Sequence, residues 1–152
     1  AIGKIGDIFS MRGITRCRKG SDAQLMVHLA DEMQQAPEGS FIFANFVEFD
    51  TVFGHRRDVE GYARALEWFD AQIGPILTQS RPDDLVIFTA DHGNDPTWRG
   101  TDHTREQVPV LVHGQNLPQK QISERVIAFQ DVAATVAAHL DVVAQGQGRS
   151  FL

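Results

Sequence analysis

The stretch 85–90, LVIFTA, is a nearly continuous apolar run that leads directly into the polar residues 91–95, DHGND. A run without polar alternation is typical of a central parallel strand that is covered on both faces. In open α/β sheets, ligands bind beyond the carboxyl ends of the strands. The residues that follow Ala90 therefore lie where a functional site is expected.

Helical and strand patterns alternate on either side of this run. Ser21 is a plausible N-cap for the first long helix, and a kink is expected near Gly74–Pro75 in the second. The alternation predicts an α/β fold with a mostly parallel sheet flanked by helices. In chain order, we expect a helix over 21–35, a strand over 40–49, a helix over 58–77 capped by Asp58, a strand over 108–113, a loop with Pro118, and a helix capped by Asp131 through Leu140.

The composition is that of an ordinary folded domain. The chain has 152 residues, of which 42% are hydrophobic and 22% are charged, so it can bury a single core. Its 20 acidic residues outnumber the 14 basic ones, and the net charge is -6. Because this balance repels nucleic acid and anionic lipid, we expect a small molecule or a metal cation as the partner, with no nucleic acid and no membrane.

The single cysteine, Cys17, allows no internal disulfide and predicts a cytoplasmic location. No apolar run reaches the roughly 18 residues that a membrane span needs. The start, AIGKIGDIFSMRG, lacks the apolar region of a signal peptide. Because this start opens on an expected strand without an initiator Met, we expect the chain to be part of a longer protein.

Metal-ligand side chains gather at the expected strand ends. Asp50 follows the 40–49 strand with His55 five residues further on, Asp91 and His92 follow the 85–90 strand, and His103 precedes the last strand. Neutral imidazole combined with carboxylate suits zinc, manganese or iron better than calcium. Five such ligands exceed what one structural ion needs. They predict two divalent ions that share a site and act together on a phosphoryl group.

The same residue types also have purely structural uses. A lone Asp or His in a loop is more often a turn or capping residue than a ligand, and no function is expected for His28, His113 or His139. The conjunction of five ligand-type residues at the expected strand ends is what favours a metal site.

Three segments carry a family resemblance. VEFDTVFGHRRDVEGYARALEWFD, TADHGNDPTWRGTDHTREQVPVLV and the terminal GRSFL resemble phosphopentomutase, a member of the alkaline phosphatase superfamily. The specific motifs are the spacing of Asp50 and His55, the GHRRD run, and DPTW followed by GTDHTRE. The resemblance covers the whole chain. It implies that 1–152 is the C-terminal part of an alkaline-phosphatase-like, metal-binding core domain, with the N-terminal core segment and the cap domain outside this chain.

The resemblance implies an isomerase that moves phosphate between the C1 and C5 hydroxyls of ribose or 2-deoxyribose, through a phosphothreonine and two manganese ions. By motif position, Asp50, His55 and His103 hold one ion, and Asp91 and His92 hold the other. The second ion also needs an aspartate and the nucleophilic threonine, both expected upstream. No catalytic nucleophile is therefore expected in this chain, which alone should bind one ion and be inactive.

Several further positions have expected roles near the ligands. The resemblance gives Lys4 a contact with substrate phosphate, although a solvated surface charge is the alternative. Asn94 stands where relatives carry Cys, and no role is expected for it because that position is not a ligand. Carboxylates that could orient the imidazoles are those of Asp58, Asp95 and Asp102, with helix capping an equal alternative for Asp58.

Arg56 and Arg57 directly follow His55. Their guanidinium groups could pair with phosphate or with a carboxylate of the core, and an ion pair is the commoner outcome.

Other functions stay open. TADHGN at 89–94 also resembles cofactor-independent phosphoglycerate mutase, although that family spaces its Asp and His one residue closer and lacks the DPTW and GHRRD segments. The same two segments argue against a plain phosphatase or sulfatase. A related mutase that acts on another sugar phosphate is a further alternative, because the substrate-selecting cap would lie outside this chain. A complete, non-catalytic metal-binding module is the alternative from a different class.

Overall fold

The computed structural model describes residues 1–117 and 125–152, and these form two compact units. The first unit comprises Ala1–Arg81 and Val86–Val112, and the second comprises Pro82–Leu85 and His113–Leu152. All five expected metal ligands belong to the first unit. The loop expected around Pro118 lies outside the described residues.

The first long helix, α2 (Asp22–Gln35), follows the short helix α1 (Ile5–Ile8) and confirms the expected helix and its cap. The Ser21 hydroxyl accepts the Gln24 backbone N–H at 3.4 Å, and the Gln24 side chain accepts the Ser21 N–H at 3.0 Å. This reciprocal arrangement satisfies two N–H groups that a helix start leaves open. The local signal therefore sufficed to fix the beginning of α2.

The second long helix, α3 (Val59–Leu77), is also confirmed. The Asp58 carboxylate accepts the Gly61 N–H at 2.9 Å, so this residue caps the helix as expected. The helix continues through Pro75 in its last turn, and its end is closed by the Thr78 N–H donating to the Gly74 carbonyl at 3.2 Å. None of the described helices is long and apolar enough to cross a bilayer.

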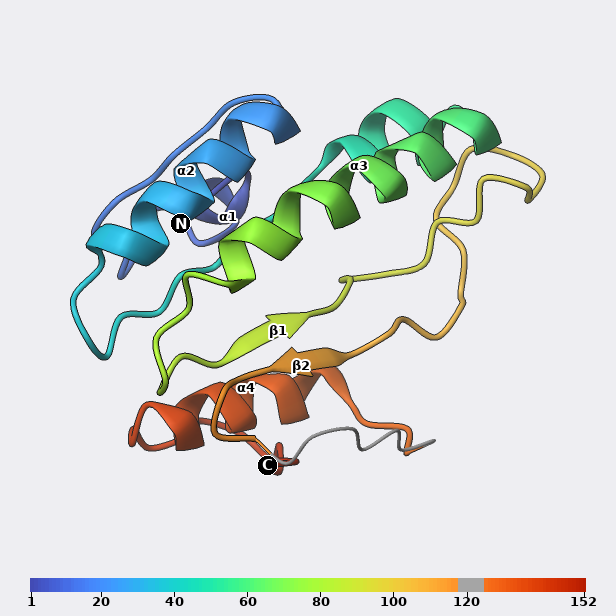
Figure 1. Cartoon of the computed structure of the whole chain (residues 1–152). Helices are drawn as coiled ribbons and strands as arrows, with labels where there is room; N and C mark the ends of the chain where they lie inside the picture. The colour runs from blue at the N-terminus through green and yellow to red at the C-terminus, as the bar shows by residue number, and fades with distance from the viewer. Residues whose placement is uncertain (118–124) are drawn as a thin grey trace. The chain divides into compact units, whose positions relative to one another are not determined.

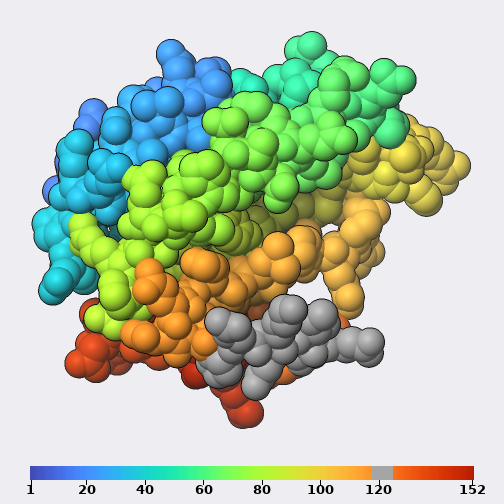
Figure 2. All heavy atoms as spheres, viewed as in Figure 1, coloured from blue at the N-terminus to red at the C-terminus, as the bar shows by residue number. Residues whose placement is uncertain are grey.

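The core of the first unit lies where α2 and α3 pack together over one face of β1 (Val86–Phe88) (Figure 1). Met26 of α2 and Ile73 and Ile76 of α3 are its buried centre. The surfaces of the two helices adjoin each other in the space-filling view (Figure 2). Half-buried apolar side chains complete the cluster: Leu29, Ala30, Met33, Phe46, Trp68, Phe69, Leu77 and Phe88.

The sheet differs from the expected mostly parallel one. Among the described residues it consists of β1 and β2 (Leu111–His113), which run antiparallel, so a parallel sheet is not confirmed. Both strands occur within apolar runs expected to be strands, but each is only three residues long. An apolar run identifies a buried extended segment, whereas strand direction depends on partners that are distant in the sequence.

The strand expected over 40–49 does not form. This segment is extended but pairs at one position only, a parallel bridge between Ala44 and Ile2, and Ile2 also bridges Arg18. From Glu48 onward the chain turns into a helical segment instead. A continuous ladder needs a partner along its whole length, and among the described residues this segment has only Ile2.

The second unit contains α4 (Phe129–His139). The expectation that Asp131 is its N-cap is wrong, because Ala128 takes that position. Asp131 lies three residues further along, where its carboxylate accepts the N–H groups of Ala128 at 3.0 Å and Arg149 at 2.9 Å. These hydrogen bonds, that from Arg149 foremost, lower the pKa of Asp131. The residue still closes the helix start, and it also anchors the C-terminal segment.

Candidate metal centre

Asp50 and His55 are brought together by a π-helix, η1 (Phe49–Gly54). The His55 N–H donates to the Asp50 carbonyl at 2.9 Å across this wider turn. As a result the His55 Nε2 lies 3.3 Å from the Asp50 Oδ2. Single π turns are rare and are frequent at functional sites, because they re-aim the side chains of one helical turn.

His92 and His103 both lie in the loop between β1 and β2. An antiparallel bridge joins Gly93 to Thr104, and the Thr104 N–H donates to the Gly93 carbonyl at 3.0 Å. A side chain on Gly93 would come within 2.9 Å of the Thr104 carbonyl oxygen, so this close approach needs glycine. The bridge stacks the imidazoles of His92 and His103, with 3.7 Å between ring centroids.

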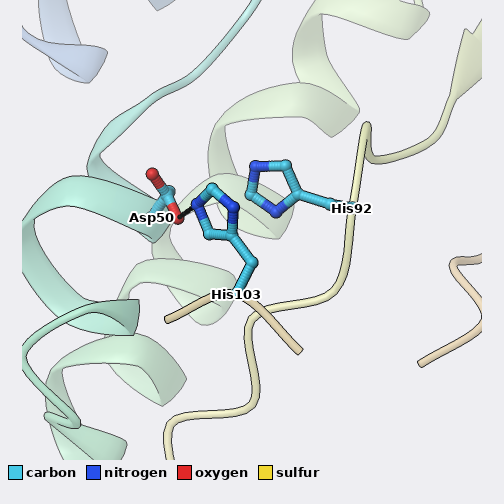
Figure 3. Close-up of side chains that lie close together, drawn as sticks. All are labelled: Asp50, His92 and His103. Atoms are coloured by element: carbon cyan, nitrogen blue, oxygen red, sulfur yellow. Dashed lines mark ion pairs between the residues drawn. The ribbon is translucent and has the colours of Figure 1, made fainter. Parts of the chain in front are cut away.

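Asp50, His92 and His103 form the tightest cluster of ligand-type groups among the described residues (Figure 3). One ligand atom from each lies within 4.8 Å of the others, and the His103 Nε2 is 3.2 Å from the Asp50 Oδ1. Metal–ligand bonds of about 2.1 Å hold the ligands of one ion roughly 3–4 Å apart, so small rotations would complete the site. Two imidazoles and a carboxylate suit a first-row divalent metal.

The tautomers of two imidazoles follow from their hydrogen bonds. The Nδ1 of His55 bonds the Thr101 carbonyl, and the Nδ1 of His92 lies 3.2 Å from the Gly93 carbonyl. A carbonyl only accepts, so each Nδ1 carries the proton. Nε2 is then the ring nitrogen that each neutral imidazole offers to a metal.

Asp91 lies apart from the triad. Its side chain is 75% exposed, and its Oδ1 is 3.6 Å from the Nε2 of His92. The structure thus places His92 with Asp50 and His103, while Asp91 sits at the edge of the group. The His55 ring, 4.7 Å from the His103 ring, lies on the other side of Asp50's carboxylate.

Lys4 is not joined to this cluster. Its side chain is exposed and forms no hydrogen bond or ion pair with any described residue. Its backbone carbonyl accepts the Ile8 N–H at 3.1 Å at the start of α1.

The three aspartates expected to orient the imidazoles make other contacts instead. Asp58 caps α3, and Asp95 accepts both the N–H and the hydroxyl of Thr97 at 2.7 Å. The Thr97 hydroxyl and N–H lower the pKa of Asp95. Asp102 contributes its backbone carbonyl, which accepts from Arg57. The expectation that these carboxylates support the imidazoles is therefore wrong for the described contacts.

Arg57 and Asn94 are the two residues whose place in the site was missed. Arg57 forms no salt bridge with a carboxylate among the described residues: its guanidinium donates to four backbone carbonyls and to the Asn94 Oδ1. Asn94 in turn donates its Nδ2 to the Asp50 Oδ1 at 2.5 Å. Both contacts join segments more than thirty-five residues apart, so no local pattern could have revealed them.

Tyr62 borders the ligands from α3. Its ring contacts Phe49 at 5.7 Å between centroids, next to Asp50 in the chain. Burial, and to a lesser degree the negative charge of Asp50, raise the pKa of Tyr62. The Asp50 carboxylate therefore lies within electrostatic range of the Tyr62 hydroxyl.

Comparison with known proteins agrees with the geometry. The family model described as the metalloenzyme superfamily matches residues 5–144. Phosphopentomutases from Rhizobium leguminosarum bv. trifolii and Methylobacterium radiotolerans are 50% and 52% identical to the whole chain, and that from Agrobacterium fabrum is 47% identical. The chain spans 37% of the length of each. The resemblance drawn from the motifs is thus confirmed, and the chain belongs to the metalloenzyme superfamily.

Proposed function

We propose that the protein carrying this chain is a phosphopentomutase, an isomerase that interconverts ribose or 2-deoxyribose 1-phosphate and 5-phosphate. One observation carries the proposal. About half of the residues are identical to phosphopentomutases along the whole chain, and the motif residues Asp50, His92 and His103 converge on one point. Its partner is then a small sugar phosphate.

The chain would supply the C-terminal part of the core domain, with the N-terminal core segment, the cap and the nucleophilic threonine carried elsewhere in the protein. Its 37% share of the relatives' length supports this division. A mostly parallel sheet would be completed by strands outside the chain. The parallel bridges of Ile2 with Arg18 and Ala44 support it, because they are the contacts that a parallel ladder would extend.

Two divalent ions, manganese in the proposed enzyme, would be held by the five ligand-type residues. Asp50, His55 and His103 would hold one, and Asp91 and His92 would contribute to the other. Bound ions would neutralise the phosphate dianion, which otherwise repels an incoming oxygen nucleophile. The position of Asp91 supports this division, because its Oδ1 lies 3.6 Å from the Nε2 of His92, a spacing that suits two ligands of one ion, while Asp91 is not part of the cluster of Asp50, His92 and His103.

The chain's own residues prepare this site. Backbone carbonyls hold the Nδ1 protons of His55 and His92, so both rings present Nε2 without a tautomer change. Lys4, exposed and unpaired among the described residues, would contact the substrate phosphate. A cytoplasmic location would agree with the free thiol of Cys17.

The test is a substrate panel with the full-length protein loaded with Mn²⁺. We expect interconversion of ribose or deoxyribose 1-phosphate and 5-phosphate, and far slower turnover of hexose phosphates, phosphoglycerates and p-nitrophenyl phosphate. Preferred isomerisation of a hexose phosphate or of phosphoglycerate would replace this proposal with a related mutase. Net release of inorganic phosphate would replace it with a phosphatase.

A further inference from the structure

We propose that Arg57 and Asn94 form a positioning pair for the metal ligands. Arg57 holds the segment between His92 and His103 in place, and Asn94, which is hydrogen-bonded to both Arg57 and Asp50, fixes the orientation of the Asp50 carboxylate. The inference rests on the proposed metal-dependent function of this site. It adds two residues that lie outside the cluster of ligand-type groups.

The hydrogen bonds that the Arg57 guanidinium donates to described residues all go to uncharged oxygen atoms. Its Nε donates to the Gly100 carbonyl at 2.6 Å and its Nη2 to the Asp102 carbonyl at 2.6 Å. Its Nη1 lies 2.8 Å from the Asp95 carbonyl and 3.1 Å from the Gly54 carbonyl. Arg57 forms no salt bridge with any described residue, so its guanidinium serves here as a rigid fork of directed donors, which a lysine ammonium cannot reproduce.

Three of these acceptors lie near the two ends of the segment between His92 and His103. Asp95 follows His92 closely, whereas Gly100 and Asp102 come just before His103. One side chain thus ties both ends of the loop to the residues that follow η1. The Arg57 backbone has a φ of 57°, a left-handed conformation that is unfavourable for a non-glycine residue. The guanidinium contacts five acceptors, three of which share the two N–H groups of Nη1, and these contacts hold the residue in this conformation.

Asn94 links this clamp to Asp50. It is 9% exposed, its Oδ1 accepts from the Arg57 Nη1 at 2.7 Å, and its Nδ2 donates to the Asp50 Oδ1 at 2.5 Å. Only this orientation of the amide satisfies both neighbours, because a guanidinium can only donate and a carboxylate can only accept. The amide therefore fixes the rotation of a carboxylate whose two oxygens face His103 and His55.

The consequence is measurable in metal affinity. Groups that orient metal ligands typically change affinity by about 10–100-fold when they are removed. Arg56 is the matched control: it is the adjacent arginine, is exposed, and makes no hydrogen bond or ion pair with any described residue. Charge alone would make the two arginines equivalent, whereas positioning makes only Arg57 matter.

The experiment titrates Mn²⁺ into the metal-free full-length protein and follows the ion by electron paramagnetic resonance, with no sugar phosphate present. The variants are Arg57→Met, Asn94→Leu, both together, and Arg56→Met. We expect the Kd for Mn²⁺ to rise about tenfold or more in either single variant and less than twofold in Arg56→Met. The rise in Kd of the double variant should be smaller than the product of the two single rises, because Arg57 and Asn94 orient Asp50 through the same hydrogen bonds.

Three readouts separate this role from a merely structural one. The line shape of bound Mn²⁺ should change in Arg57→Met and Asn94→Leu, whereas lost stability alone would lower the melting temperature and leave both Kd and line shape unchanged. Arg57→Lys should not restore the Kd, because it keeps the charge but not the fork. If Arg57→Met does not fold, Arg57→Lys replaces it in the double-variant comparison.

The outcomes also separate this inference from the proposed function. Equal Kd values for Arg57→Met and Arg56→Met, or fully multiplicative single effects, would overturn the positioning pair and leave the mutase proposal standing. The expected Kd pattern in a protein that does not act on pentose phosphates would do the reverse. Absence of Mn²⁺ binding by the wild-type protein would overturn both.

Discussion

His103 is the residue on which the other ligands converge. Its Nε2 is 3.2 Å from Asp50, its ring stacks on His92 at 3.7 Å, and the His55 ring lies 4.7 Å away. It also belongs to the loop that Arg57 ties down at Gly100 and Asp102. Removing this imidazole takes one potential metal ligand from the cluster of Asp50, His92 and His103. It leaves no buried cavity, because His103 is exposed.

We therefore predict that His103→Ala lowers the Mn²⁺ content of the full-length protein. The Kd for Mn²⁺ at the site that keeps only Asp50 and His55 should rise by about tenfold or more. Atomic emission after gel filtration gives the content, and titration gives the Kd. His139→Gln, an exposed position at the end of α4 in the second unit, is the control and should bind as the wild type does. An unchanged metal content in His103→Ala would remove His103 from the ligand set.

Asp22 is a buried carboxyl group that joins α2 to the segment leading into η1. Its two oxygens accept the N–H groups of Val47 and Glu48 at 3.1 Å each, and its own N–H donates to the Glu48 side chain at 3.2 Å. Burial raises the pKa of Asp22 to about 6, and the nearby Glu48 charge adds to it, despite the opposing effect of the backbone N–H donors.

This shift predicts a pH dependence of stability. The folded state holds the Asp22 proton more tightly than the unfolded state, so the stabilisation is complete below about pH 4 and is lost as pH rises through about 6. In urea unfolding with chelator, the free energy of unfolding of wild type relative to Asp22→Asn should fall by about 1–3 kcal/mol between pH 4 and pH 7.5. Asp31→Asn, exposed on the same helix, should show no such trend. A difference that grows with pH would contradict the assignment.

At the scale of elements, η1 works because Gly54 lets the π-helix approach the β1–β2 loop. A Cβ at this buried position would lie 2.6 Å from the Asn94 Cγ and 3.0 Å from the Phe49 carbonyl oxygen. Asn94 cannot yield easily, since it is buried and hydrogen-bonded on both sides. The element that carries Asp50 is therefore locked to the loop that carries both His92 and His103.

Gly54→Ala should accordingly weaken Mn²⁺ binding and destabilise the protein by about 1–3 kcal/mol, the usual cost of overpacking. Gly74→Ala is the matched change within α3, where a Cβ meets nothing within 4 Å. It should change the free energy of unfolding by less than about 1 kcal/mol, because the better helix propensity of alanine is opposed by the crowding of its Cβ against the following Pro75. Thermal melting and Mn²⁺ titration of both variants check the pair, and equal effects would show that the contact at Gly54 is not tight.

The elements also show what a sequence can and cannot predict here. The helices α2 and α3 were predictable because their signals, the Ser21 and Asp58 caps and the spacing of apolar residues, are local. Strand content was not, because an extended segment such as 40–49 becomes a strand only when partners lie alongside it. In the site, Asp50 and His55 were predictable from their spacing. The link from Arg57 through Asn94 to Asp50 required the folded chain.

For the whole molecule, the exposed apolar surface of the first unit is informative. Phe41 and Phe43 are 59% and 42% exposed, and their rings contact each other at 5.7 Å. Phe9 of the first unit joins them, 6.4 Å from Phe43, and is also exposed. Contiguous exposed aromatic side chains are typical of surfaces that another segment or protein covers. In the proposed enzyme this surface is where the remainder of the core would pack against the extended segment that pairs with Ile2.

This surface and the ligand count together predict the behaviour of residues 1–152 expressed alone. In the proposed enzyme the chain would carry all of one ligand set, Asp50, His55 and His103, but only part of the second, so we expect it to bind one Mn²⁺ per molecule where the full-length protein should bind two. It should not interconvert ribose 1-phosphate and 5-phosphate, because the proposed threonine is elsewhere.

The isolated chain should also bind more of a hydrophobic dye per mole than the full-length protein, and Phe41→Ser combined with Phe43→Ser should lower that excess. Metal analysis, a coupled mutase assay and dye fluorescence check the three expectations, and mutase activity of the isolated chain would refute the divided active site.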